Sequence, residues 1–151
     1  MKTSQIKAVL FSLSVMAAAI APNFANAHES GARALGAGAG ATDVYLVSCF
    51  DDGDGPTSYL TVAVQDLLPK AGPIVNIQIF RDGFVNNASD LVDGDAVASP
   101  FIKLSRGDGT YFVIVNKTKS GAENYQFEYH CMTAGNAHTG TSDVLQYKQN
   151  Q

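Results

Sequence analysis

Apolar and polar residues alternate with a period of two along most of this chain, and this alternation constrains its fold more than any other feature. In residues 124–131, Tyr125, Phe127 and Tyr129 share one face and polar residues lie between them. Successive side chains of a β-strand point to opposite faces of a sheet, so this period predicts strands with one buried face. Strands are predicted over residues 43–50, 58–65, 73–80, 96–104, 110–116, 124–131 and 143–147.

Polar turns separate the predicted strands. Segments such as DDGDGP at residues 51–56 are built from Gly, Asp and Pro, which are favoured in tight turns. Residues 110–116 are apolar on both faces, which indicates a central strand, whereas Pro100 indicates an edge strand or a bend. The sequence therefore predicts an all-β fold, an antiparallel β-sandwich of jelly-roll-like type with about seven to eight strands.

Residues 1–27 have the three parts of a secretory signal peptide. The start is basic, residues 8–21 are apolar, and Ala25 and Ala27 form the small-residue pattern that places cleavage before His28. An uncleaved anchor is the alternative, but this apolar run is shorter than the about 20 residues that span a bilayer. We therefore expect a bacterial protein exported to the periplasm or secreted, with no membrane insertion after processing.

The remainder divides into a leader, one domain and a short tail. Residues 28–42 read HESGARALGAGAGAT, and so many small residues cannot bury enough surface to offset the entropy of ordering them. We expect a flexible leader over residues 28–42, a sandwich domain over residues 43–148 and a frayed end over residues 149–151.

Cys49 and Cys131 are the two cysteines of the chain. They lie far apart in sequence and lack the C-x-x-C spacing of metal or redox pairs, and exported proteins fold under oxidising conditions. Both fall on predicted inward faces, Cys49 with Tyr45 and Val47, and Cys131 with Tyr129. The sequence therefore predicts a disulfide between Cys49 and Cys131.

The net charge argues against two classes of partner. The chain carries 10 basic and 14 acidic residues, a net charge of -4, and removal of Lys2 and Lys7 with the signal peptide would take it to -6. Nucleic acid and anionic lipid are bound by clustered Lys and Arg. We expect neither as a partner, and instead a protein or polysaccharide partner, with self-association as a further option.

Three segments resemble a known family: TDVYLVSC (42–49), DLVDGDAVASPFIKL (90–104) and GDGTYFVIVNKTKSGAENYQFEYHC (107–131). The third is similar to the closing strands of the bacterial pre-peptidase C-terminal (PPC) domain, through Gly109, Thr110, Tyr111, Gly121, Asn124 and Tyr125. The resemblance implies a jelly-roll-like accessory module of exported proteins that acts in adhesion, secretion or stability, with calcium in some members. Here only the Gly-rich leader lies upstream and the disulfide departs from the pattern, so we expect a free-standing module.

Two aspartate-rich turns are candidate calcium ligands. Asp51, Asp52 and Asp54 lie in DDGDG, and Asp93 and Asp95 lie in VDGD. Calcium binds several oxygen ligands, which clustered aspartates supply. The alternative is ordinary turn chemistry on an acidic surface, because Asp-Gly pairs are common in turns.

Histidine and methionine side chains give a second candidate metal site. His130, Met132 and His138 lie close together in EYHCMTAGNAH, and imidazole with thioether suits copper. His28 becomes the amino terminus if cleavage occurs as predicted, and its amine and imidazole can chelate copper together. The alternative is that His130 lies on the polar outer face of its strand, beside Glu128.

The sequence favours binding over catalysis. It has no G-x-S-x-G motif and no thiol left free by the disulfide. Phe80, Phe84 and Phe101 flank predicted loops, where packing in the core or at bends is simpler than an exposed adhesive surface. We expect a non-catalytic, calcium-stabilised binding or accessory module, with a structural subunit of an extracellular complex and a periplasmic copper-binding protein as alternatives.

Overall fold

The computed structural model describes residues 28–70 and 72–150. All regular elements in this part of the chain are strands, and no helix there has the length and apolar character to cross a membrane. The strands are β1 (His28–Glu29), β2 (Arg33–Leu35), β3 (Thr42–Phe50), β4 (Tyr59–Leu67), β5 (Val75–Arg81), β6 (Phe84–Asp90), β7 (Ile102–Leu104), β8 (Gly109–Lys117), β9 (Glu123–Met132), β10 (Gly140–Thr141) and β11 (Leu145–Asn150). The signal peptide predicted over residues 1–27 lies outside the described residues.

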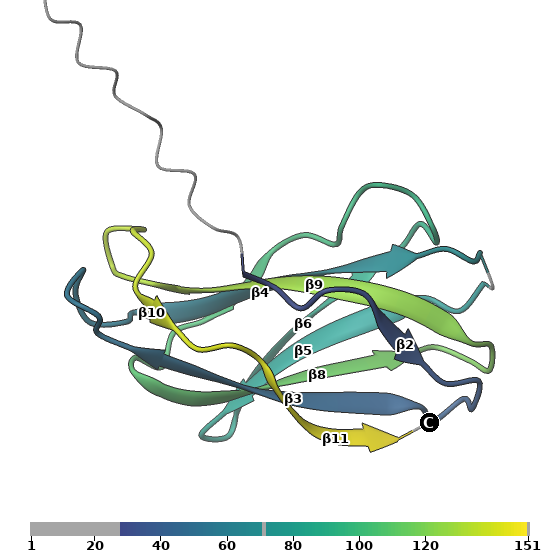
Figure 1. The fold of residues 1–151 in the computed structure, drawn as a ribbon, viewed down its shortest axis with the longest axis horizontal. Coiled ribbons are helices and arrows are strands. Elements are labelled where there is room, and N and C mark those ends of the chain that lie inside the picture. Colours follow the sequence, from purple (N-terminus) through teal and green to yellow (C-terminus); the bar gives the residue numbers. More distant parts are fainter. Residues whose placement is uncertain (1–27, 71, 151) are drawn as a thin grey trace, which may run out of the picture.

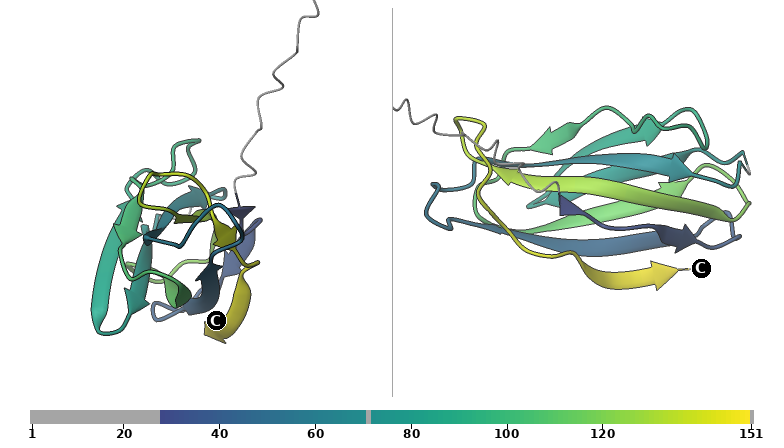
Figure 2. Two further views of the ribbon diagram at one scale, coloured as in Figure 1. Left: turned by 90° about the vertical axis from the view of Figure 1, so that its left-hand side faces the viewer. Right: turned by 45° about the horizontal axis from the view of Figure 1, so that its top comes forward.

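The strands form two antiparallel sheets that face each other (Figures 1 and 2). The first sheet has the order β1-β9-β4-β7, with β2 also paired to β9. The second has the order β10-β3-β8-β5-β6, with β11 also paired to β3. The predicted antiparallel β-sandwich is therefore confirmed, and β8, apolar on both faces, is a central strand as expected.

The alternation predicts the core correctly. Tyr45 and Val47 of β3 and Tyr125, Phe127 and Tyr129 of β9 are all at most 2% exposed. They meet the inward residues of the other long strands, which are Leu60, Val62, Val64, Val75, Ile77, Ile79, Tyr111, Val113 and Val115. Because each sheet presents one apolar face, stacking the two sheets removes both faces from water.

The predicted disulfide is confirmed. Cys49 of β3 and Cys131 of β9 are bonded, with a Cα–Cα distance of 5.5 Å. The two strands belong to different sheets, so the bond joins the two layers of the sandwich directly.

The prediction of a flexible leader over residues 28–42 is wrong. β1 and β2 both pair with β9, and Leu35 is 1% exposed. The Ser30 N–H donates to the Phe127 carbonyl at 2.9 Å, and the Phe127 N–H donates to Ser30 Oγ at 3.0 Å. The composition argument considered side-chain burial alone, whereas backbone hydrogen bonds along the edge of β9 hold this segment.

The chain has more strands than predicted. Gln149 and Asn150, expected to fray, belong to β11 and pair with β3, while residue 151 lies outside the described part. β6 was not predicted because FVNNASD lacks apolar alternation, and this strand pairs with β5 alone at the edge of its sheet. The strand predicted over residues 96–104 shrinks to β7, which is an edge strand next to Pro100, as that proline indicated.

Candidate functional site

The register between β4 and β9 separates the candidate residues into two ends of the sandwich. Leu67 pairs with Asn124 at one end of the two strands, and Tyr59 pairs with Met132 at the other. We call the first the carboxylate end and the second the histidine end, after the side chains that gather there.

Three acidic side chains meet at the carboxylate end. Asp66 lies near the end of β4, Asp93 in the loop between β6 and β7, and Glu123 at the start of β9. One carboxylate oxygen from each of the three lies within 4.8 Å of the others. We call this group the carboxylate centre.

The acids of the carboxylate centre are buried without hydrogen-bond partners. Asp66 is 0% exposed and Glu123 is 1% exposed, and neither oxygen of either side chain has a hydrogen bond of normal geometry. Asp93 is half-buried; its Oδ2 accepts the Gly72 N–H at 2.8 Å, while its Oδ1 is buried and unpartnered. Buried carboxylates are almost always hydrogen-bonded, paired with a positive charge or neutralised by a proton, so five unpartnered oxygens in one place require either a partner or protonation.

The electrostatics of the centre point the same way. Burial, followed by the charges of Glu123, Asp93 and Asp90, raises the pKa of Asp66 to about 7. The N–H of Val75 lies near enough to lower this pKa in part, although its geometry falls short of a hydrogen bond. Burial and Asp93 also raise the pKa of Glu123. The three negative charges repel one another in a site from which water is largely excluded.

The conformation of Gly94 helps to position the neighbouring Asp93 in this centre. Gly94 has φ +65°, and a Cβ at this position would lie 2.9 Å from side-chain carbons of both Leu68 and Lys70. A larger residue would clash there and would also be strained at this φ, so Gly94 lets the loop approach the end of β4. Gly94 therefore has two roles in VDGD: it allows the turn, and it positions Asp93 in the carboxylate centre.

The other acids near this end have structural partners. Asp90 accepts the Asp66 N–H at 2.8 Å through Oδ2 and the Val92 N–H at 3.2 Å through Oδ1. Asp95 accepts the Val97 N–H at 2.7 Å and is not part of the three-acid cluster. Of the two predicted ligands in VDGD, the structure therefore brings only Asp93 to the carboxylate centre.

The predicted ligands in DDGDG lie at the opposite end of the molecule. Asp51 Oδ1 accepts the N–H groups of Gly53 at 2.8 Å and Gly55 at 3.1 Å, and Asp52 Oδ1 accepts the Asp54 N–H at 3.3 Å. All three aspartates are exposed. These bonds are turn chemistry of the kind held open as the alternative. The two turns therefore lie at opposite ends of the sandwich, and the aspartates of DDGDG are not part of the carboxylate centre.

Sequence reasoning missed Asp66 and Glu123, although a signal was present. Asp66 continues the inward register of Leu60, Val62 and Val64 in β4, and Glu123 continues that of Tyr125 in β9. An acidic residue in an inward register has to be neutralised or paired. Clustering along the sequence was the weaker guide, because the fold collects these acids from three separate elements.

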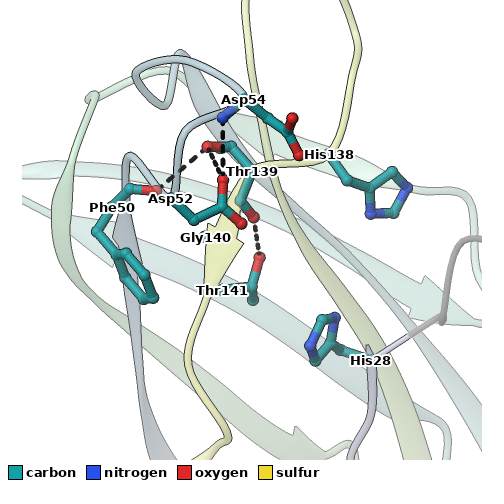
Figure 3. Close-up of a pocket in the computed structure, with 8 residues that line it drawn as sticks. All are labelled: His28, Phe50, Asp52, Asp54, His138, Thr139, Gly140 and Thr141. Atoms are coloured by element: carbon teal, nitrogen blue, oxygen red, sulfur yellow. Dashed lines mark hydrogen bonds between the residues drawn. The ribbon is translucent and has the colours of Figure 1, made fainter.

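All three histidines of the chain gather at the histidine end. The ring centroids of His130 and His138 are 4.6 Å apart, and those of His28 and His130 are 6.3 Å apart. His28 and His138 line a pocket of about 480 Å³ together with Asp52, Asp54, Phe50 and residues 139–141 (Figure 3). Met132 forms a backbone bridge with His138, and the register of β9 places it on the same face as His130.

His130 is buried, in contrast to the expectation of an exposed position on a polar face. It is 8% exposed, and the rings of His28 and His138 pack against it. Burial, with smaller contributions from His138 and His28, lowers the pKa of His130 to about 4. At neutral pH its imidazole is therefore uncharged, and the ring nitrogen that carries no hydrogen can bind a metal.

Comparison with known proteins gives no match: the chain is not similar to any protein-family model, curated protein sequence or solved structure searched. The resemblance to the PPC domain stays a prediction.

Proposed function

We propose that this chain is an exported, non-catalytic binding module whose sandwich is stabilised by a calcium ion at the carboxylate centre. The observation that carries this proposal is the set of five buried carboxylate oxygens of Asp66, Asp93 and Glu123 that have no hydrogen-bond partner. A divalent cation would neutralise the charge that burial and mutual repulsion make unfavourable.

The donor set favours calcium among the common divalent cations. Calcium takes six to eight oxygen ligands and accepts bidentate carboxylates in irregular geometry, whereas magnesium requires a near-ideal octahedron and retains several waters. Three carboxylates supply up to six oxygens, and Asp66 and Glu123 are too enclosed to leave room for a wide shell of water. Soft metals are disfavoured because every ligand is an oxygen.

A nearby lysine does not replace the cation. Burial lowers the pKa of Lys117, and Glu123 offsets this in part. The Lys117 ammonium group donates to the carbonyl oxygens of Gly36 and Gly121, whereas both Glu123 oxygens stay without a hydrogen bond. Lys117 therefore reduces the negative field around the centre without satisfying its carboxylates.

The enclosure of these acids supports a binding role rather than catalysis. Burial raises the pKa values of Asp66 and Glu123, but a general acid or base must also reach its substrate. At 0% and 1% exposure they are closed off from solvent. A bound ion would instead tie the loop between β6 and β7 to β4 and β9.

Thermal unfolding with and without calcium tests the proposal. After treatment with chelator, millimolar calcium should raise the Tm of the wild-type protein by about 5 °C or more, as expected for a ligand present well above its Kd. Asp93→Asn should abolish most of this rise. Asp95→Asn is the matched control, because it removes the same charge from the same loop and should keep the rise. An unresponsive wild type, or an equal response in Asp93→Asn, would contradict the proposal.

The disulfide is the observation that supports export, because such bonds persist in oxidising compartments. Expression of the full chain in a bacterial host, followed by fractionation and intact-mass measurement, tests this part. We expect periplasmic or secreted protein that begins at His28 and has no free thiol. Cytoplasmic protein that retains residues 1–27 would contradict it.

An apolar stripe on the outer face of the second sheet supports the binding role. The stripe crosses all five long strands at directly opposed positions, which are Val85, Phe80, Phe112, Leu46 and Leu145. Phe80 is 39% exposed, Val85 59% and Leu145 63%, so the prediction that Phe80 packs in the core or at a bend is wrong. Phe84 and Phe101 are likewise exposed. Contiguous apolar surface on a folded protein marks an interaction site.

The composition of the stripe favours a protein partner over a polysaccharide. Sugars bind by stacking on aromatic rings, whereas in this stripe aliphatic side chains flank the aromatic ones. We infer a second copy of the chain, since one stripe can face another around a two-fold axis. Sedimentation velocity from micromolar to near-millimolar protein should show a dimer that Phe80→Ser weakens. Asn76→Ser, on the same face of β5, is the control. A wild type that stays monomeric would contradict this part without affecting the calcium site.

A further inference from the structure

The histidine end carries a second, independent cluster of potential metal ligands. His28, His130 and His138 are all the histidines in the sequence, and they come from β1, β9 and the loop before β10. The Nδ1 atoms of His28 and His130 are buried and have no hydrogen-bond partner. Convergence of every histidine from three separate segments, with two ring nitrogens unsatisfied, requires a chemical explanation.

The spacing of the rings suits a shared metal ion. A ring nitrogen bonds a transition metal at 2.0–2.1 Å, which places the ring centroid about 3.2 Å from the ion. Two rings at right angles around one ion then have centroids about 4.5 Å apart, and two rings on opposite sides have centroids about 6.4 Å apart. The observed separations are 4.6 Å for His130 and His138 and 6.3 Å for His28 and His130. The nitrogens of the three histidines do not all lie within 4.8 Å of one another as placed, so the side chains would have to rotate to bring all three rings onto one ion.

The chemistry of the donors selects the metal class. Neutral imidazoles suit copper, zinc and nickel, and copper(II) forms the most stable complexes of this series. The exposed carboxylates of Asp52 and Asp54 line the same pocket as His28 and His138, and they would attract a cation to it (Figure 3).

We propose that His28, His130 and His138 together bind one copper ion at the histidine end. If processing occurs before His28, the new α-amine and Nδ1 of the same residue can chelate the ion as well. This site is separate from the carboxylate centre, which offers only oxygen ligands.

Copper titration of the processed protein tests the proposal. Protein that begins at His28 should bind one copper(II) ion, and its electron paramagnetic resonance spectrum should show coupling to several nitrogens. His138→Gln and His28→Gln should each weaken binding by about 10- to 100-fold or more. His138 is only half-buried, so this variant is expected to fold, and the near-ultraviolet circular dichroism spectrum checks that it does. Glu29→Gln, beside His28 and exposed, is the matched control and should bind as the wild type does.

Two further proteins distinguish this site from other modes of binding. One residue added before His28 should weaken binding without abolishing it. Asp93→Asn should bind copper normally even if its response to calcium is lost. The proposal is overturned if the wild type binds no copper or if His138→Gln binds as tightly as the wild type. It is also overturned if the added residue alone removes binding, or if folded Asp93→Asn loses copper.

Discussion

Asp66 occupies an inward position of β4, where the alternation of the strand predicts an apolar side chain. It follows Leu60, Val62 and Val64 on the inward face, and it is fully buried as they are. Its pKa is raised to about 7, first by burial and then by Glu123, Asp93 and Asp90. Without a cation, Asp66 therefore holds a proton in the folded state over a range in which the unfolded chain has lost it.

This difference predicts an unusual dependence of stability on pH. The unfolded value is 3.8 and the folded value is about 7, so in chelator the free energy of unfolding should fall as the pH rises from about 4 to 7, by up to about 4 kcal/mol. The proposed calcium ion would bind the ionised carboxylates, so its stabilising effect should grow over the same range.

Urea unfolding at several pH values, with chelator or with calcium, measures both effects. Asp66→Asn is the control, because an amide cannot titrate; it should flatten the fall in chelator and abolish the response to calcium. A wild type in chelator whose stability rises between pH 4 and 7 would contradict the raised pKa of Asp66.

Another acidic residue, Asp43, is buried in the core, where tyrosine hydroxyl groups form hydrogen bonds around it. The Tyr125 hydroxyl donates to Asp43 Oδ2 at 2.7 Å, and the Tyr45 and Tyr125 hydroxyl oxygens are 2.6 Å apart. Tyr125→Phe removes two buried side-chain hydrogen bonds, one to Asp43 and one to Tyr45, and should lower the free energy of unfolding by about 1.5–3 kcal/mol. Tyr111→Phe is the matched control. Its hydroxyl donates to the neutral Gly107 carbonyl at 2.7 Å, so its loss should cost about 0.5–1.5 kcal/mol. Equal losses in urea unfolding would contradict the larger contribution of the Tyr125 hydroxyl.

At the scale of elements, β1 and β2 are held mainly by the backbone. Ser30 lies between them; its N–H donates to the Phe127 carbonyl, and its Oγ accepts the Phe127 N–H at 3.0 Å. Ser30→Ala would leave that buried N–H without a partner, which costs about 1–3 kcal/mol. Amide exchange at residue 127 should accelerate by about 10- to 100-fold, because local opening of β1 becomes easier. Unchanged exchange at residue 127 would contradict this role; Glu29→Ala, exposed on β1, is the control.

The elements also show what the sequence could predict. Long strands such as β4 and β9 alternate strongly, so their faces, their core residues and the disulfide follow from parity. β1, β2 and β6 carry no such pattern, since each is held by the edge of a neighbouring strand, and edge pairing depends on backbone groups that every residue shares.

The carboxylate centre could be predicted only in part for a related reason. Parity places Asp66 and Glu123 inward, but their meeting with Asp93 depends on loop paths that no local pattern encodes. The histidine cluster could be proposed from the short segment that holds His130 and His138. The burial of His130 could not, because it results from packing against His28 of β1 and His138 of the loop before β10.

At the scale of the whole molecule, the two ends of the sandwich carry different groups: a disulfide lies near one end and the carboxylate centre lies at the other. Cys49–Cys131 joins the two sheets near the histidine end, because Cys131 follows His130 in β9. At the other end, the carboxylate centre brings together β4, β9 and the loop between β6 and β7, which the proposed cation would tie to one another. Leu60, opposite Cys131, and Asp66 are six residues apart on β4, which is about 20 Å of extended chain.

This separation predicts that the two devices act independently. In the chain-entropy account, a disulfide closing a loop of 82 residues stabilises the fold by about 4.5 kcal/mol, and groups more than about 10 Å apart contribute additively within about 0.5 kcal/mol. Urea unfolding of the wild type and of Cys49→Ala/Cys131→Ala, each with calcium and with chelator, measures all four states. Calcium should add the same free energy of unfolding in both proteins. A calcium increment that disappears with the disulfide, while the double variant keeps its far-ultraviolet circular dichroism spectrum, would show instead that the cation needs the sheets clamped at the far end before its ligands come together.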